Sequence, residues 1–230
     1  NISDIHRAVV MVQRDEDLYP RKYNRGSTVF SNNWYAKPPI IDRESFTLYS
    51  DWNDRLSTKI RYSHYQLTED DASIGDPFMP EVNIEVCDGW DCDNVYLGGD
   101  RYRGANFIDI DSDFLSFKAT YDLGDHVLTA GIDRDESAVY NLFIARYNGE
   151  VQFDSIADFE SGEYSYLRFH TPQTGIADVD SVAANFDIEK TSLYVQDRIY
   201  LGDLTLDVGL RYDAVETPTL PVANPKFEER

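Results

Sequence analysis

The sequence predicts an all-β fold: a segment of an antiparallel transmembrane β-barrel with long extracellular loops. Three observations predict this fold. Apolar and polar residues alternate with a period of two in several runs, and tight turns join these runs into pairs. Long connections then separate one pair from the next. In an outer-membrane barrel, short turns face the periplasm and long loops face outside, so this layout matches that architecture.

The strands are predicted by strict alternation, which gives an extended chain one apolar and one polar face. The clearest run covers residues 204–213, and two more cover residues 115–122 and 128–133. Weaker alternation marks residues 46–52 and 56–62. With the remaining weaker runs, we expect roughly seven or eight strands.

The polar face of these strands carries charges of both signs, such as Asp207 and Arg211 on one strand. Such a face suits a hydrated lumen, where opposite charges pair across neighbouring strands. The alternating residues Leu206, Val208 and Leu210 are then predicted to face lipid. Alternation alone leaves open a soluble β-sandwich, in which the same apolar residues pack against a second sheet.

Tight turns join the alternating runs. Asn53-Asp54, Gly124-Asp125 and Gly202-Asp203 each lie between two runs. Glycine, asparagine and aspartate tolerate the positive φ angles that two-residue hairpin turns require. We therefore expect these three turns at one end of the sheet, with the cysteine-containing loop at the other end.

Two long connections complete the layout. Residues 68–101 are acidic and contain both cysteines, and a second connection occupies much of residues 136–185. Compact soluble domains rarely contain structureless loops of this length. The asymmetry between short turns and long loops is therefore the strongest sequence signal for a barrel.

The composition is strongly acidic. The chain has 21 Lys plus Arg against 42 Asp plus Glu, which gives a formal net charge of −21. Nucleic-acid binding requires a basic surface that displaces counterions, so no nucleic-acid partner is expected. The charge fits an acidic extracellular surface, a saline habitat or cation-rich surroundings, and a solvated, self-repelling surface explains it without any partner. No apolar run of about 18 residues is present, which excludes a transmembrane helix.

The two cysteines, Cys87 and Cys92, are separated by four residues that include Gly89. This spacing allows a small disulfide-closed loop, which would form in an oxidising compartment. Reduced thiols without a structural role are the alternative. Two thiols with no nearby histidine are too few for a structural zinc site.

No catalytic, cofactor or metal site is predicted, and the chain is not expected to be an enzyme. Residues 109–113 read Asp-Ile-Asp-Ser-Asp, like the start of a calcium loop. Phe114 stands where that loop needs glycine, and Thr120 stands where it needs glutamate, so the EF-hand interpretation fails. A solvated strand edge is the preferred interpretation, and an irregular calcium site in an outer loop is the alternative. The four histidines show no spacing typical of a metal site or a catalytic triad. They are His6, His64, His126 and His170.

Ligand-binding residues cannot be assigned from the sequence. Five aromatic residues in or near the loops are candidates for contact with a ligand such as a sugar. They are Trp34, Tyr35, Trp90, Tyr96 and Tyr102. Packing within the loops, or a girdle at the membrane interface, explains such residues without any ligand.

One stretch resembles a known family. Residues 192–213 combine Tyr-Val-Gln-Asp on one strand, a short turn, and Leu-Asp-Val-Gly-Leu-Arg-Tyr-Asp on the next strand. This combination resembles the barrel of TonB-dependent outer-membrane receptors, in which Tyr-x-Gln-Asp and Leu-x-x-Gly-x-Arg-Tyr-Asp recur. Residues 126–162 are also similar to the larger Oar-type receptors of the same superfamily.

The resemblance implies a barrel of about 22 strands, an N-terminal plug and energy supplied by TonB. Residues 1–230 then form a partial β-barrel domain, about a third of the barrel, with the plug domain and the C-terminal strands absent. Both ends look cut from a longer chain, since no signal peptide begins the sequence and the polar residues 227–230 end no strand. No binding residue is carried over, because the family's ligand contacts lie mostly in the plug and the variable loops.

The function implied by the resemblance is that of a receptor and transporter in the cell outer membrane. It would take up a scarce ligand: a siderophore, a metal complex, a carbohydrate or a peptide. The expected partners are outer-membrane lipid, TonB through the missing N-terminal region, and an unknown small ligand. A secreted acidic β-sandwich that binds carbohydrate and a surface adhesion protein built on the same barrel are the alternatives.

Overall fold

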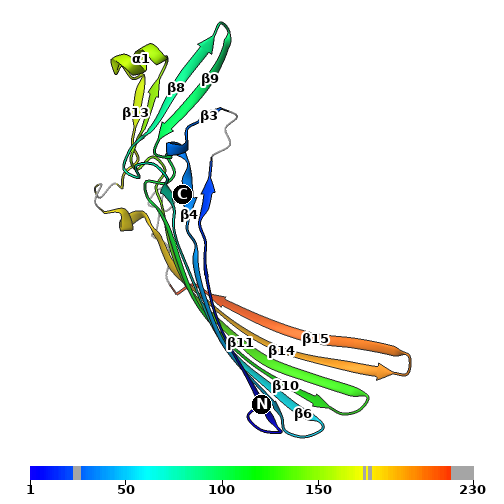
Figure 1. Cartoon of the computed structure of the whole chain (residues 1–230). Helices are drawn as coiled ribbons and strands as arrows, with labels where there is room; N and C mark the ends of the chain where they lie inside the picture. The colour runs from blue at the N-terminus through cyan, green and yellow to red at the C-terminus, as the bar shows by residue number, and fades with distance from the viewer. Residues whose placement is uncertain (23–26, 173–174, 176–177, 219–230) are drawn as a thin grey trace, which may run out of the picture.

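The computed structural model describes residues 1–22, 27–172, 175 and 178–218. In this part of the chain, seven long antiparallel strands form one curved sheet, which we call the wall (Figure 1). Its strands, in sheet order, are β1 (His6–Glu16), β5 (Ile40–Asp51), β6 (Leu56–Asp70), β10 (Asn106–Asp122), β11 (His126–Phe143), β14 (Ala184–Leu201) and β15 (Leu204–Glu216). The predicted polar end at residues 227–230 lies outside the described residues.

A second sheet of five short strands, which we call the loop sheet, lies beyond one end of the wall (Figure 1). Its strands, in sheet order, are β13 (Tyr166–Arg168), β12 (Glu150–Phe153), β8 (Glu81–Asp88), β9 (Asp91–Gly98) and β3 (Thr28–Val29). Two of its pairings are parallel, β12 with β8 and β3 with β9. The loop sheet therefore joins segments from three different long connections of the wall.

The remaining elements are short. A small three-stranded sheet contains β2 (Tyr19–Arg21), β4 (Tyr35–Lys37) and β7 (Ala72–Ser73), and the helices are η1 (Ser31–Asn33), α1 (Ile156–Ser161) and η2 (Val179–Val182). Ser155 caps the start of α1 by accepting a hydrogen bond from the Asp158 amide at 3.1 Å. Among the described residues, no helix is long and apolar enough to cross a membrane.

The predicted position of the tight turns is confirmed. All three turns lie at the same end of the wall, and the cysteine-containing hairpin β8–β9 projects from the other end (Figure 1). Gly124 and Gly202 have φ angles of +89° and +65°, in the region that favours glycine. Asn53 closes its own turn, because its side-chain oxygen accepts from the amides of Arg55 and Leu56 at 2.9 and 3.0 Å.

The predicted loops were too long and too unstructured. Strand β11 continues to Phe143, so the expected loop at residues 136–185 begins later than predicted. Beyond Arg134, each face of β11 carries both polar and apolar side chains, so the period-two alternation that marks a strand is absent there. The connection at residues 68–101 contains the hairpin β8–β9 and contributes to the loop sheet.

The wall contains one strand that the sequence analysis missed. The alternation did not reveal β1, because Val9 and Met11 on one face are as apolar as Ala8 and Val10 on the other. The calcium-like residues 109–113 lie within β10, in extended backbone, as expected for a strand and not for an EF-hand loop.

Only small apolar clusters are buried in the described residues. Val82, Ile84 and Phe153 form one cluster in the loop sheet. Ala105, Leu142 and Ile144 form the other, at the loop end of the wall. The wall itself encloses no core, and its large apolar side chains are largely exposed. Such a surface needs an apolar medium or a partner.

Candidate functional site

One face of the wall carries a row of apolar side chains that crosses all seven strands. Residues opposite each other in an antiparallel pair share a face of the sheet. From β15 to β1, the row is Tyr212, Leu193, Ile132, Phe117, Ile60, Leu48 and Ala8. Leu206, Val208 and Leu210, which were predicted to face lipid, lie on this same face and are 40%, 59% and 75% exposed.

This apolar face has no second sheet packed on it within the described part of the chain. A β-sandwich would cover the face with a second sheet about 10 Å away. Burying such side chains in an apolar medium is favourable by roughly 25 cal/mol per Å² of surface. The wall therefore has the outer surface of a membrane-spanning barrel, and the sandwich alternative lacks its second layer.

The opposite face of the wall is charged, and its ion pairs run between strands. Arg198 of β14 lies 2.8 Å from Asp207 of β15, and Arg211 of β15 lies 3.4 Å from Asp133 of β11; Arg211 also lies 2.9 Å from Asp213 on its own strand. Asp207 and Arg211 thus lie on the face predicted for them. These side chains are mostly about half exposed, so water screens each pair and its contribution to stability is small. Their arrangement is typical of a hydrated surface.

Cations also gather on the charged face near the turn end. Lys59 and Lys118 lie directly opposite each other in the register of β6 and β10. The guanidinium of Arg7 lies 4.1 Å from the ring centroid of Tyr49, and the Lys59 ammonium lies 5.4 Å from the same centroid. Like charges directly opposite each other destabilise a sheet unless water and salt screen them. This pairing again indicates a wet face.

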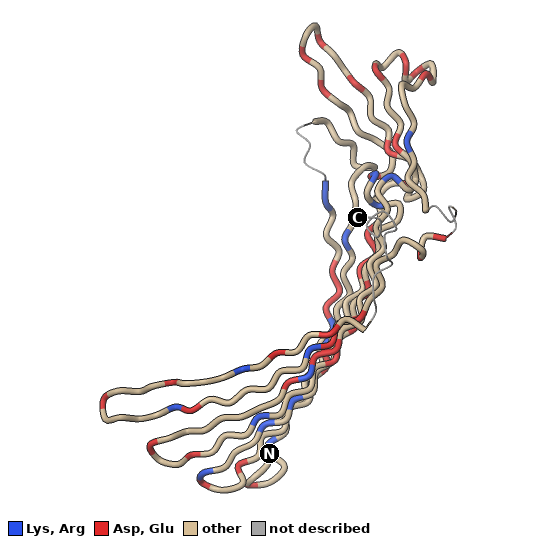
Figure 2. The backbone as a smooth tube through the Cα atoms, turned by 180° about the vertical axis from the view of Figure 1, so that it is seen from behind, with Lys and Arg blue, Asp and Glu red and all other residues tan. Residues whose placement is uncertain are grey.

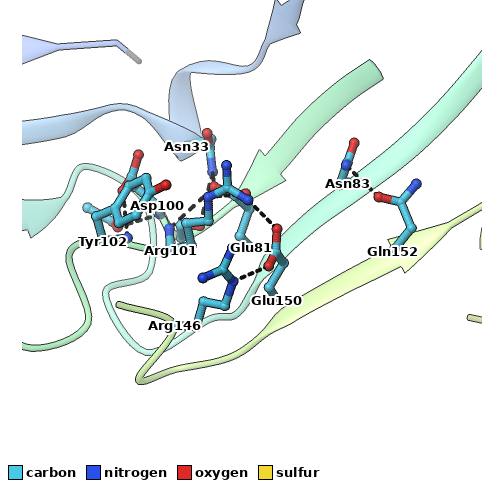
Figure 3. A network of polar contacts seen from close by, with 11 residues as sticks. Asn33, Glu81, Asn83, Asp100, Arg101, Tyr102, Arg146, Glu150 and Gln152 are labelled. Atoms are coloured by element: carbon cyan, nitrogen blue, oxygen red, sulfur yellow. Dashed lines mark hydrogen bonds and ion pairs between the residues drawn. The ribbon is translucent and has the colours of Figure 1, made fainter. Parts of the chain in front are cut away.

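A buried polar cluster lies where the loop sheet meets the wall (Figure 3). The side chains of Glu81 and Glu150 are 0% and 1% exposed, and these residues begin the parallel strands β8 and β12. Arg101 lies between them, with its Nε 3.7 Å from Glu81 and its Nη1 in contact with Glu150. Arg146 contacts the other oxygen of Glu150, and the Asn33 amide donates to Glu81 at 3.3 Å.

The cluster balances two buried carboxylates with two guanidinium groups, which fixes the geometry of the junction. Arg101 precedes β10 and Arg146 follows β11, so the two strands that meet the loop sheet supply the cations. A buried carboxylate without a cation would be strongly unfavourable. No local sequence pattern marks the cluster, because Glu81, Arg101 and Glu150 lie far apart in the chain.

Burial and charge compete at the carboxyl groups of the junction. Burial alone would raise the pKa of Glu150, but the hydrogen bond from Arg146 and the charge of Arg101 outweigh it and lower that pKa below its ordinary value. At Asp71, just beyond β6, burial outweighs the charges of Arg103 and Lys37 and raises the pKa to about 6. The contributions of Glu150 and Asp71 to stability therefore change in opposite directions as the pH rises.

We expect the stability of the junction to pass through a maximum at roughly pH 4–5. Asp71 holds its proton more tightly in the folded state, so its contribution is present at low pH and is lost as the pH rises through about 6. Glu150 contributes above its unfolded pKa and loses that contribution as the pH falls through its lowered folded pKa. Hydrogen exchange at the junction of the full-length protein, corrected for intrinsic rates, measures this profile. Asp71→Asn is expected to abolish the loss on the alkaline side; an unchanged profile would contradict the assignment.

The hairpin β8–β9 ends in a tip that the two cysteines close. Cys87 and Cys92 lie opposite each other and form a disulfide in the structure. Gly89 in the turn has a φ of +66°, and Trp90 beside it is fully exposed. A disulfide at this position holds the two strands together below the exposed indole.

We expect Cys87 and Cys92 to form a disulfide in protein molecules that have matured outside the cytoplasm. The peptide that contains both residues should be about 2 Da lighter without reduction than after reduction, because forming the bond removes two hydrogens. Cys92→Ser should remove this mass difference, which provides the control. Labelling of both thiols by a maleimide before reduction would refute the pairing.

The aromatic candidates from the sequence differ in their surroundings. Tyr96 is buried in the loop sheet, and Tyr102 stacks on Phe143 with ring centroids 6.3 Å apart. Arg103 lies 4.1 Å above the ring of Tyr35, and the Trp34 indole donates to a backbone carbonyl at 3.4 Å. Packing within the loops therefore explains these four. Trp90 is the one of the five that presents its whole side chain to solvent.

One histidine lies beside two of the calcium-like aspartates. His64 Nδ1 is 3.2 Å from Asp113, and its Nε2 is 3.8 Å from Asp111. Sequence spacing could not show this group, because its members come from the neighbouring strands β6 and β10. The hydroxyl of Tyr62 also donates to Asp113 at 2.5 Å. These hydrogen bonds account for the geometry, and we assign no metal to it.

Comparison with known proteins identifies the family. Residues 9–226 match the family model described as TonB dependent receptor-like, beta-barrel. The outer membrane transporter YddB from Escherichia coli has a similar structure, with a TM-score of 0.57 and 15% identity over 93% of this chain and 26% of that chain. The FrpB iron transporter from Neisseria meningitidis (F3-3 variant) aligns with a TM-score of 0.51 and 14% identity over 94% of this chain and 30% of that one. No curated protein matches the chain.

At these identities the two solved transporters share the fold, and the chain covers 26% and 30% of their lengths. The family match extends over nearly the whole chain, which confirms the resemblance seen in residues 192–213. The likeness to Oar-type receptors stays a prediction. With its apolar outer face and its charged inner face, the chain belongs to the TonB-dependent receptor-like β-barrel family and lies in the outer membrane.

Proposed function

We propose that this chain is part of a receptor that takes up a scarce ligand across the outer membrane with energy supplied by TonB. The observation that carries the proposal is the two-faced wall. Its outer face is apolar and uncovered. Its inner face holds the opposed cations Lys59 and Lys118 and cross-strand ion pairs such as Arg198–Asp207. A charged, hydrated inner face suits the passage of a polar solute, whereas adhesion requires only the loops.

The same proposal treats residues 1–230 as a partial barrel domain. Strands β1 and β15 are the edges of the wall in the described part of the chain, and an open edge exposes unpaired backbone groups. In a bilayer such groups must be paired, so further strands of the receptor would continue the sheet on both sides. The plug domain and the contact with TonB would belong to the remainder of the receptor.

The ligand class is the finer part of the proposal. Siderophores, metal complexes, carbohydrates and peptides all suit a polar path. A ferric complex is the first ligand to test, because FrpB is described as an iron transporter and shares the fold. The histidine–carboxylate group of His64, Asp111 and Asp113 does not decide between the classes.

Uptake by cells tests the proposal. Deleting the gene for the full-length receptor should abolish accumulation of radiolabelled iron from its ferric complex. The intact gene should restore accumulation, but only in cells that retain TonB. The same design with a labelled oligosaccharide or peptide tests the other classes. Receptor-dependent accumulation that persists without TonB would refute energy coupling, and loss of adhesion without any loss of uptake would favour the adhesion alternative.

A further inference from the structure

The loop sheet has one apolar face that is only partly covered. Val86 and Val95 lie on this face with Ile84, as the register of β8 and β9 shows. Helix α1 covers part of it, with Phe159 packed edge-on against Phe153 at 5.2 Å between ring centroids. The remainder forms a cavity of about 400 Å³, which we call the loop-sheet pocket. It is lined by Phe30, Ser31, Asn32, Ile84, Val86, Val95, Leu97, Ile156 and Phe159.

The pocket is built from three separate parts of the chain. Residues 30–32, at and just before η1, form one side, β8 and β9 form the floor, and α1 forms the other side. Its size lies within the range typical of small-molecule sites, which are mostly apolar with a few polar groups at the rim. Phe30 and Ile156 at its mouth are 54% and 52% exposed, so the opening is accessible in the described structure.

The rim beyond the pocket is acidic. In the register of the hairpin, Asp93 lies opposite Val86, and Asp88 lies opposite Asp91, on the same face as the pocket floor. All three aspartates are exposed. Residues 81–98 contain no lysine, arginine or histidine. Figure 2 shows the result: acidic residues, and no basic ones, along the projecting hairpin. Glu85 lies on the opposite face of the hairpin, away from the pocket.

We propose that the loop-sheet pocket binds a small amphipathic cation: a molecule with an apolar body and an ammonium or guanidinium group at one end. The apolar body fills the pocket, and the cation faces the rim formed by Asp88, Asp91 and Asp93. An anion of the same shape would meet three like charges and is rejected. This site goes beyond the proposed uptake, because it needs only the loop sheet and does not depend on whether the ligand is imported.

The test compares two probes with similar skeletons and opposite charges, 4-phenylbutylamine and 4-phenylbutyrate. Binding to the full-length receptor in lipid nanodiscs is measured by ligand-observed NMR, with empty nanodiscs as the background. The amine should bind saturably and the carboxylate should not. Asp93→Asn should weaken binding of the amine about two- to fivefold, the effect of one exposed charge pair. Glu85→Gln is the matched control, because it removes the same charge from the other face, and it should leave the affinity unchanged.

A second variant tests the pocket itself. Val86→Lys places a cation in the pocket and should abolish binding of the amine while leaving the receptor folded, as judged by its resistance to SDS. Should this variant fail to fold, the comparison of Asp93→Asn with Glu85→Gln still shows whether the acidic rim contributes to binding of the amine. Equal binding of both probes would overturn the proposal, because it would show apolar adhesion without charge selection. Binding of neither probe would also overturn it, because other loops of the receptor would then cover the pocket.

Discussion

Replacing Arg101 by methionine is expected to destabilise the loop sheet by about 3–5 kcal/mol, because breaking a buried ion pair leaves a charge without a partner. Methionine keeps much of the side-chain length but no charge. Glu150 would retain Arg146, whereas Glu81 would lose the cation 3.7 Å away and retain the hydrogen bond from Asn33. The damage should therefore concentrate on β8, which begins with Glu81.

Hydrogen exchange measures the effect strand by strand in the full-length receptor. The amides of β8 and β12 should exchange faster by about two to three orders of magnitude, while the amides of β10 and β11 within the membrane should not change. Arg168→Met is the matched control: Arg168 lies on β13 of the same sheet, but it is exposed, and its guanidinium lies 4.3 Å from the centroid of the Tyr166 ring. We expect Arg168→Met to destabilise the loop sheet by less than about 0.5 kcal/mol.

A second substitution separates loss of charge balance from loss of packing. Glu81→Gln in the Arg101→Met background removes the uncompensated carboxylate and should recover a large part of the lost stability. Should the double variant be as unstable as the single one, packing of the arginine stem would be the main contribution. Equal effects of Arg101→Met and Arg168→Met would mean that the cluster does not hold the loop sheet in place.

The wall could be predicted from the sequence because each strand carries its own signal. Period-two alternation in residues 204–213 identified both faces of β15, and the glycine-containing turns fixed which ends of the strands lie together. The period-two alternation is absent where the two faces of a strand carry similar mixtures of residues. Beyond Arg134 both faces of β11 mix polar and apolar residues, and along β1 both faces are apolar, so neither segment alternates.

The loop sheet could not be predicted, because its pairings are not local. Strand β12 joins β8 in parallel across 69 residues, from Glu81 to Glu150, and no hairpin turn specifies that register. The buried cluster depends on the same long-range pairing: Arg101 is an ordinary charged loop residue until β12 brings Glu150 beside it. The hairpin β8–β9 is the local exception, since the spacing of Cys87 and Cys92 predicted a small closed loop at its tip.

A lysine at Val195 is expected to cost about 2–4 kcal/mol of folding free energy in a bilayer, the range for a cation near the midplane of a barrel's lipid face. Val195 lies on β14 between Leu210 of β15 and Ala130 of β11, next to the apolar row that crosses the wall. It is 49% exposed, and no acid opposes it in these pairs. Val208 is a poorer test, because its register partner is Asp197, which would offer the new ammonium a carboxylate.

The adjacent residue provides the matched control. Gln196 lies on the charged face of the same strand, and its amide donates to Asp207 at 3.2 Å. A lysine at Gln196 gains that carboxylate in a hydrated lumen, so it should change the folding free energy by less than about 0.5 kcal/mol. Urea titration of the full-length receptor in lipid vesicles, with the folded fraction read from resistance to SDS, compares the two variants. Equal tolerance of both lysines would contradict a lipid-facing surface, because water on both sides of β14 penalises neither. A large cost at Gln196 with none at Val195 would mean that the two faces of the wall are assigned the wrong way round.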